Sequence, residues 1–91
     1  SRQRLTIQYS GHVQGVGFRY TARSVATGFE VAGLVRNLPD GRVELVAEGE
    51  RAELEAFREA IRDSGLNSLI RQETVTWSSA TGELRGFEIV R

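Results

Sequence analysis

The chain has 91 residues, and this length predicts a single domain over residues 1–91. Lys plus Arg and Asp plus Glu both number 12, so the net charge is zero and no long-range field attracts nucleic acid or an anionic membrane; any anion site must be local. The absence of cysteine excludes a disulfide framework, a cysteine-ligated metal centre and a thiol nucleophile.

The first predicted element is a strand over residues 5–10, because Leu5, Ile7 and Tyr9 alternate with polar residues. The segment 11–17 contains three glycines and has no helical period, so it predicts a loop, which we call the glycine loop. A helix is expected directly after it, since apolar residues recur there at helical spacing. This apolar stripe comprises Phe18, Ala22, Val25, Ala26 and Phe29.

Two strands are predicted over residues 31–37 and 42–48. The four residues Leu38-Pro39-Asp40-Gly41 separate them. Proline presets the backbone angle of a turn and glycine tolerates a positive one, so the two strands should form a hairpin.

The second half of the chain begins with an amphipathic helix over residues 50–64, which Gly65 should end. A fourth strand follows over residues 73–79, and a short last strand carries Phe87 and Ile89. The order is therefore β-α-β-β-α-β with a short C-terminal extra strand. It predicts an α+β, ferredoxin-like sandwich: a mainly antiparallel sheet with two helices on one face.

No apolar run approaches the roughly 20 residues that a membrane-spanning helix needs, and the N-terminus lacks the apolar core of a signal peptide. We therefore expect a cytoplasmic protein that binds no membrane, and we expect it to be a monomer. Because ferredoxin-like domains include RNA binders, metal carriers and enzymes, the function has to be argued from individual residues.

The glycine loop has the composition of an anion site. Gly15 and Gly17 flank Val16 immediately before a helix, so successive backbone N–H groups can face an anion beside the positive end of the helix dipole. Arg19 falls in the first helical turn, where its guanidinium can make two hydrogen bonds to a bound phosphate. Taken alone, such a loop is more often only a strand-to-helix turn.

Asn37 ends the second predicted strand, just before the turn. An asparagine at such a place usually serves the turn itself. Its neutral amide also offers one donor and one acceptor, with which it can hold a water molecule in line with a phosphorus atom.

Two segments resemble the signatures of the acylphosphatase family. Gly11-His12-Val13-Gln14-Gly15-Val16-Gly17-Phe18-Arg19 is similar to the first signature, G-x-V-Q-G-V-x-F-R. Gly33-Leu34-Val35-Arg36-Asn37, followed by Gly41, Val43 and Gly49, resembles the second. The resemblance extends over nearly the whole chain, and Arg19 and Asn37 stand at the spacing of the family's phosphate-binding arginine and water-orienting asparagine.

The resemblance implies a hydrolase that cleaves acyl phosphates, which are carboxyl-phosphate anhydrides, to a carboxylate and inorganic phosphate. It implies no metal, no organic cofactor and no covalent nucleophile. Arg19 and Asn37 would be the catalytic residues, with Asn37 holding the water for in-line attack. The phosphate-binding groups would be the Arg19 guanidinium and the backbone amides of Gln14, Gly15, Val16, Gly17 and Phe18.

Two other functions are disfavoured by the residues. An RNA-binding module would need aromatic side chains on its central strands, whereas the third predicted strand has none and carries Glu44 and Glu48, which would repel a phosphate backbone. A metal carrier of this fold would be expected to show a C-x-x-C loop.

A third alternative stays open, a catalytically silent domain that binds phosphate in a regulatory or assembly role. The expected partners are a small acyl phosphate, or inorganic phosphate or a similar anion in the glycine loop, and no nucleic acid. The sequence leaves the acyl group of the substrate open.

Overall fold

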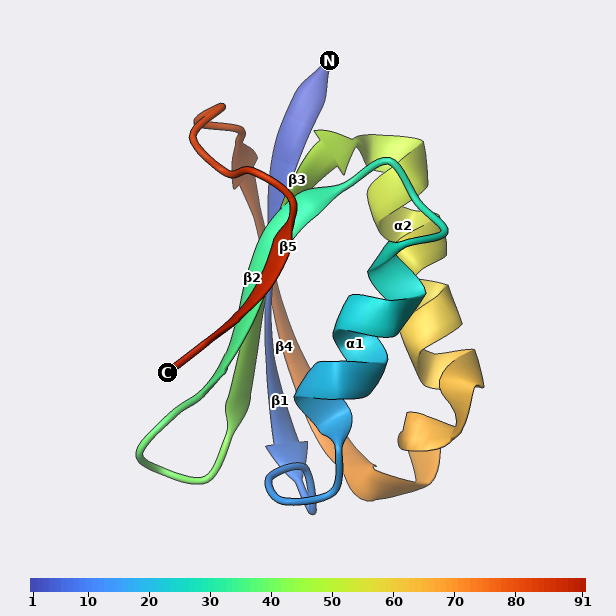
Figure 1. Ribbon diagram of the computed structural model, residues 1–91, viewed down its shortest axis with the longest axis vertical. Coiled ribbons are helices and arrows are strands. Elements are labelled where there is room, and N and C mark those ends of the chain that lie inside the picture. Colours follow the sequence, from blue (N-terminus) through green and yellow to red (C-terminus); the bar gives the residue numbers. More distant parts are fainter.

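The computed structural model describes residues 1–91 and has the predicted order of elements (Figure 1). Both helices lie on the same side of the sheet (Figure 1). The strands are β1 (Arg2–Gly11), β2 (Ala32–Asn37), β3 (Val43–Glu50), β4 (Ile70–Ser79) and β5 (Phe87–Val90). The helices are α1 (Phe18–Ala26) and α2 (Arg51–Ile61), and α2 continues into a π-helical turn (Arg62–Leu66) and a 3-10 turn (Asn67–Leu69).

The sheet has the strand order β4-β1-β3-β2-β5. β1 pairs antiparallel with β3 and β4, β2 pairs antiparallel with β3, and β5 pairs parallel with β2. The predicted ferredoxin-like arrangement is confirmed, and the short C-terminal strand β5 forms one edge of the sheet, next to β2. None of the helices has the length and apolar character that crossing a bilayer requires.

Several boundaries differ from the sequence prediction. β1 begins at Arg2 rather than at residue 5, because its first residues pair with the far end of β3, Arg2 opposite Glu50. β4 begins at Ile70, which pairs with Gly11 beyond an irregularity in the register. The regular part of the second helix ends at Ile61, before Gly65, whose φ of 96° is left-handed. Pairing with a distant strand extends both β1 and β4, and a local pattern does not show this.

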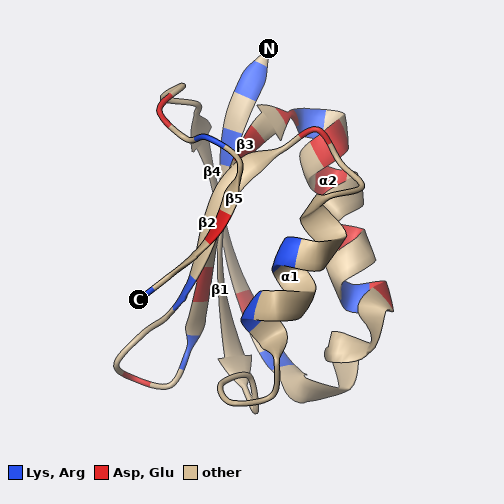
Figure 2. Cartoon of the chain, in the orientation of Figure 1, with Lys and Arg blue, Asp and Glu red and all other residues tan.

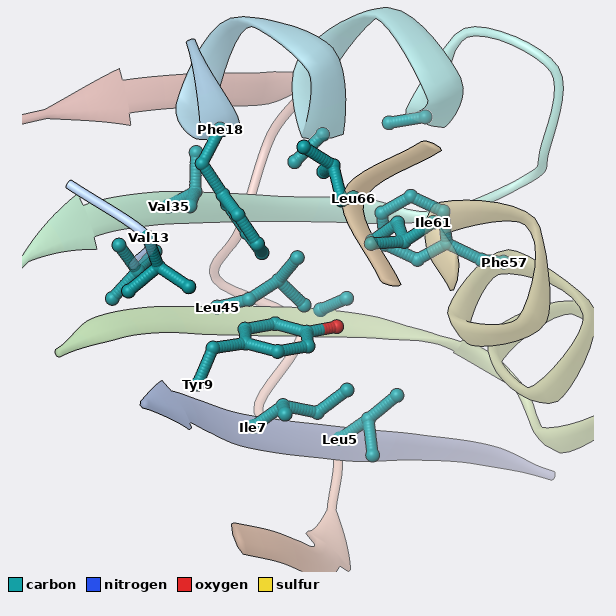
Figure 3. Close-up of a cluster of buried hydrophobic side chains, with 14 of the residues drawn as sticks. Leu5, Ile7, Tyr9, Val13, Phe18, Val35, Leu45, Phe57, Ile61 and Leu66 are labelled. Atoms are coloured by element: carbon teal, nitrogen blue, oxygen red, sulfur yellow. The ribbon is translucent and has the colours of Figure 1, made fainter. Parts of the chain in front are cut away.

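The core lies between the sheet and the two helices (Figure 3). The alternation predicted for β1 is confirmed, since Leu5, Ile7 and Tyr9 are all fully buried. Phe18 packs onto Tyr9 with 4.8 Å between ring centroids, and this contact seats the start of α1 on the sheet. Phe29, expected on the apolar stripe of α1, lies beyond the end of that helix. Its ring still packs against the ring of Phe57, with 5.9 Å between the centroids.

The face of the sheet away from the helices holds one buried carboxylate. Glu48 is 1% exposed and accepts hydrogen bonds from Arg4 Nε (2.8 Å), the Thr81 N–H (2.9 Å) and hydroxyl (3.1 Å), and the Gly82 N–H (3.0 Å). Burial alone raises the pKa of Glu48, but the hydrogen bonds from Thr81, Arg4 and Gly82 outweigh it and lower this pKa to about 2. Glu48 therefore presents no exposed charge, and the expectation that it would repel RNA is wrong.

Candidate active site

A small cavity joins the glycine loop to the ends of two strands. Its volume is about 100 Å³. The residues around it are Val13, Gly15, Gly17, Arg19, Tyr20, Asn37 and Ile89. The structure therefore brings together Arg19, at the start of α1, and Asn37, at the end of β2, as the sequence predicted. Ile89 comes from β5, and no signal in the sequence connected it with this cavity.

The backbone of the glycine loop has the conformation that its glycines predicted. Gly15 and Gly17 have φ values of 76° and 80°, in the left-handed region that side chains disfavour. Gly17 caps α1, and its carbonyl accepts the first helical hydrogen bond, from the N–H of Thr21 (3.0 Å). The first turn of α1 contains no acidic residue that would offset the helix dipole.

The N–H groups of Gln14 to Phe18 donate to no backbone acceptor of the protein. A run of unpaired donors at the positive end of a helix favours an anion, because each oxygen of the anion can accept a hydrogen bond there. Two of these residues also anchor the loop, since Phe18 is buried in the core and Val16 packs against it.

Gln14 has a role that the sequence did not show. Its side-chain amide donates to the carbonyls of Leu38 (2.8 Å) and Arg42 (2.9 Å). These carbonyls flank the turn of the β2–β3 hairpin, which follows Asn37 directly. Gln14 therefore ties the glycine loop to the hairpin and fixes the position of the loop relative to Asn37.

Asp40 stabilises the turn of the hairpin. The Asp40 carboxylate accepts hydrogen bonds from the Arg42 N–H (3.1 Å) and from Arg42 Nε (2.7 Å). The backbone hydrogen bond from Arg42 is the main reason why the pKa of Asp40 is lowered. Asp40 thus serves the turn and is not among the residues around the cavity.

Arg19 and Asn37 have no partners that would occupy them. Arg19 forms no ion pair with any carboxylate of the protein. Asn37 Oδ1 is buried and accepts no hydrogen bond. The cavity thus combines a permanent cation with a set of free backbone donors, which can hold a phosphate, and it is lined by an asparagine whose buried Oδ1 is unpaired.

The surroundings of the cavity offer no obvious metal ligands. No group of three or more His, Asp or Glu side chains is placed to hold a metal ion. His12, in the glycine loop, is exposed, and its backbone N–H donates to the carbonyl of Leu69 (2.9 Å).

Comparisons with known proteins agree with the resemblance seen in the sequence. The family model for acylphosphatase matches residues 5–89. An acylphosphatase of Acaryochloris marina is 45% identical over 82 residues, which cover 90% of this chain and 87% of that protein. An acylphosphatase of Nocardia farcinica is 42% identical over 85 residues, covering 93% and 85%. The crystal structure of acylphosphatase from Bacillus subtilis superposes with a TM-score of 0.88 at 38% identity, covering 98% of this chain and 99% of that one.

Proposed function

The chain belongs to the acylphosphatase family, and from this premise we propose that it hydrolyses acyl phosphates by in-line attack of a water molecule that Asn37 holds. The observation that carries the proposal is that Asn37, whose Oδ1 is buried and unpaired, lines the same cavity as Arg19 and the glycine loop. A buried acceptor without a donor costs stability, so a ligand that donates a hydrogen bond to it would be favoured there.

The phosphoryl group of the substrate would lie in the glycine loop. The N–H groups of Gln14 to Phe18 and the guanidinium of Arg19 would donate to its oxygens. In a loose transition state, negative charge spreads over the equatorial oxygens of the transferred phosphoryl group. Donors that are already fixed in place stabilise this charge without rearranging, which lowers the barrier.

The water molecule would donate a hydrogen bond to Asn37 Oδ1, which leaves a lone pair of its oxygen directed at phosphorus. A bond forms between this oxygen and phosphorus, and the bond from phosphorus to the bridging acyl oxygen breaks. The electron pair of the broken bond leaves with the carboxylate, and the proton of the water passes to the phosphate product or to solvent. Because a carboxylate is a stable leaving group, positioning can replace a strong general base.

The positive charge in this scheme comes from Arg19 and the backbone dipoles, so the proposed reaction needs no metal. A cytoplasmic location and a monomeric state stay predictions.

The first test is hydrolysis of benzoyl phosphate in the presence of EDTA by the wild type and by Arg19→Ala and Asn37→Ala. We expect kcat/KM to fall about 1000-fold or more for Arg19→Ala and about 100- to 1000-fold for Asn37→Ala. Arg71→Ala and Asn67→Ala are matched controls, because both residues are exposed and neither lines the cavity. A folded wild type with only background hydrolysis would favour the silent phosphate-binding domain instead.

A second test follows the oxygen atom of the water. Hydrolysis in water enriched in ¹⁸O should place the label in inorganic phosphate, because the proposed attack is at phosphorus. Mass spectrometry of both products measures this. Label in the carboxylate would mean attack at the carbonyl carbon, and the role proposed for Asn37 would then be wrong.

A further inference from the structure

A groove of about 630 Å³ opens beside the cavity. It shares Arg19, Tyr20, Asn37 and Ile89 with the cavity and adds Arg23, from α1, and Arg91, which follows β5. We call it the arginine groove. No acidic residue lines it. Because it adjoins the place proposed for the phosphoryl group, it is the place where the acyl part of a substrate would extend.

The arginine groove concentrates unpaired positive charge in a chain whose net charge is zero. All 12 basic residues are arginines, and six of them form ion pairs with carboxylates. Among the other six, Arg19, Arg23 and Arg91 all line this groove. α1 contains two arginines and no acidic residue. Figure 2 shows basic segments and no acidic one on this helix. The phosphate site itself would use only Arg19, so Arg23 and Arg91 are left to meet a second negative charge.

The spacing along α1 fits a substrate with two charged ends. Arg23 follows Arg19 by four residues, which places it on the same face of the helix and about 6 Å further along the axis. Tyr20, which is 69% exposed, and Ile89 are the uncharged side chains between the two ends. The Arg23 guanidinium lies 5.1 Å from the centre of the Tyr20 ring, a contact that holds it beside the groove.

We propose that the arginine groove selects acyl phosphates whose acyl group carries a second negative charge, a carboxylate or a phosphate, on an apolar body. Arg23 is the main specificity-determining residue and Arg91 the second. The proposal rests on the proposed function, because the phosphoryl group must first lie in the glycine loop. It names the class of substrate that the sequence left open.

The test measures binding of two stable analogues, so that it does not depend on turnover. Benzylphosphonate and 4-(phosphonomethyl)benzoate differ only in the para carboxylate, which carries the second charge, and calorimetry at low salt gives both values of Kd. We expect the wild type to bind the carboxylate-bearing analogue more tightly. Arg23→Gln should reduce this preference about fivefold and Arg91→Gln should reduce it less, whereas Arg23→Lys should retain part of it.

Arg71→Gln is the matched control. It removes the same charge from an exposed residue of β4, at the edge of the sheet opposite to β5, and should leave the preference unchanged. A parallel comparison of kcat/KM for 4-carboxybenzoyl phosphate and benzoyl phosphate should show the same change of ratio. The intrinsic reactivities of the two substrates cancel, because the same pair is compared in every variant.

The outcomes separate this proposal from the proposed function. If Arg23→Gln weakens both analogues by the same factor, Arg23 acts on the phosphoryl group and the proposal is overturned, while hydrolysis of benzoyl phosphate still supports the function. If the wild type shows no preference for the second charge, the proposal is likewise overturned. If neither analogue binds, the phosphate site in the glycine loop is wrong, and both the proposed function and the proposed specificity are overturned.

Discussion

Asn37 and Glu48 lie on neighbouring strands, β2 and β3, and each buries a side-chain oxygen, but the two oxygens are in opposite states. The Glu48 carboxylate accepts hydrogen bonds from Arg4, Thr81 and Gly82. Asn37 Oδ1 accepts none. A satisfied buried group contributes to the fold, whereas an unsatisfied one is a cost that the fold must carry. The difference suggests that Glu48 serves stability and Asn37 serves a ligand.

Tyr9 shows that a buried side-chain oxygen without a hydrogen-bond partner does not by itself indicate a ligand site. Its hydroxyl is also buried without a partner, and burial, followed by the charge of Glu73, raises the pKa of Tyr9 above its ordinary value. Tyr9 belongs to the hydrophobic core and is not among the residues around the cavity. An unsatisfied atom therefore indicates a site only where it borders a cavity that also contains free groups of complementary chemistry.

Within this comparison the largest effect is expected at Asn37, where a substitution should lower activity without lowering stability. We expect Asn37→Ala to lose about 100- to 1000-fold in kcat/KM, while its free energy of unfolding stays equal to or rises above that of the wild type, since no hydrogen bond of Oδ1 is lost and an unsatisfied buried oxygen is removed. Urea denaturation and benzoyl phosphate hydrolysis measure the two quantities. A large loss of stability would show that Asn37 supports the fold, and the contrast with Glu48 would disappear.

Glu48→Gln should give the opposite result. The glutamine amide keeps the volume but loses the charge, and its NH₂ group cannot accept a hydrogen bond. Depending on which oxygen it replaces, either the bond that Gly82 donates to Oε1 or the bonds that Arg4 and Thr81 donate to Oε2 are lost. We expect the free energy of unfolding to fall by about 2 kcal/mol, with kcat/KM of the folded enzyme unchanged. Glu50→Gln is the control, because Glu50 is exposed and pairs only with the terminal amino group. Equal losses in both variants would contradict the structural role of Glu48.

Acid should remove the contribution of the Glu48 carboxylate to the stability of the wild type. The pKa of Glu48 is about 2 in the folded state against an ordinary value of 4.5, so the unfolded chain takes up a proton that the folded protein does not. The contribution of Glu48 is fully present above pH 4.5 and is lost as the pH falls towards 2. The free energy of unfolding of Glu48→Gln should therefore depend less steeply on pH in this window. Parallel curves for the two proteins would argue against the lowered pKa.

The sequence predicted the parts of the site that depend on local chemistry. Glycines at positive φ, the arginine in the first helical turn and the asparagine before a turn are all contained in short segments, and the structure brings Gly15, Gly17, Arg19 and Asn37 around one cavity. The buried face of β1 was also predicted, because the alternation of apolar and polar residues is a local pattern. The assignment of roles to Arg19 and Asn37 stays a prediction.

The parts that the sequence missed all depend on contacts between distant segments. Glu48 is buried by residues 81–82, and a charged residue next to Ala47 gave no sign of this. Ile89 and Arg91 reach the site only because β5 pairs with β2. Such contacts follow from the pairing of strands, which composition and periodicity within one segment do not determine.

The smallest effect on activity is expected for Gln14. Its side chain combines features of Asn37 and Glu48, because it lies near the cavity and its amide is hydrogen-bonded. We expect Gln14→Ala to lower the free energy of unfolding by about 1 kcal/mol, since two hydrogen bonds to the hairpin are lost, and to lower kcat about tenfold by loosening the loop relative to Asn37. Gln72→Ala, at an exposed position of β4, is the control.

A double-mutant cycle shows whether Gln14 acts through Asn37. If Gln14 only positions the loop against Asn37, the Gln14→Ala change should lower kcat much less in the Asn37→Ala background than in the wild type, because the water that the geometry serves is already lost. The loss of stability should be the same in both backgrounds. Fully additive effects on kcat would mean that Gln14 acts on the phosphoryl group independently of Asn37. The Gln14 amide would then serve the reaction, as proposed for Asn37, and not only the fold, as Glu48 does.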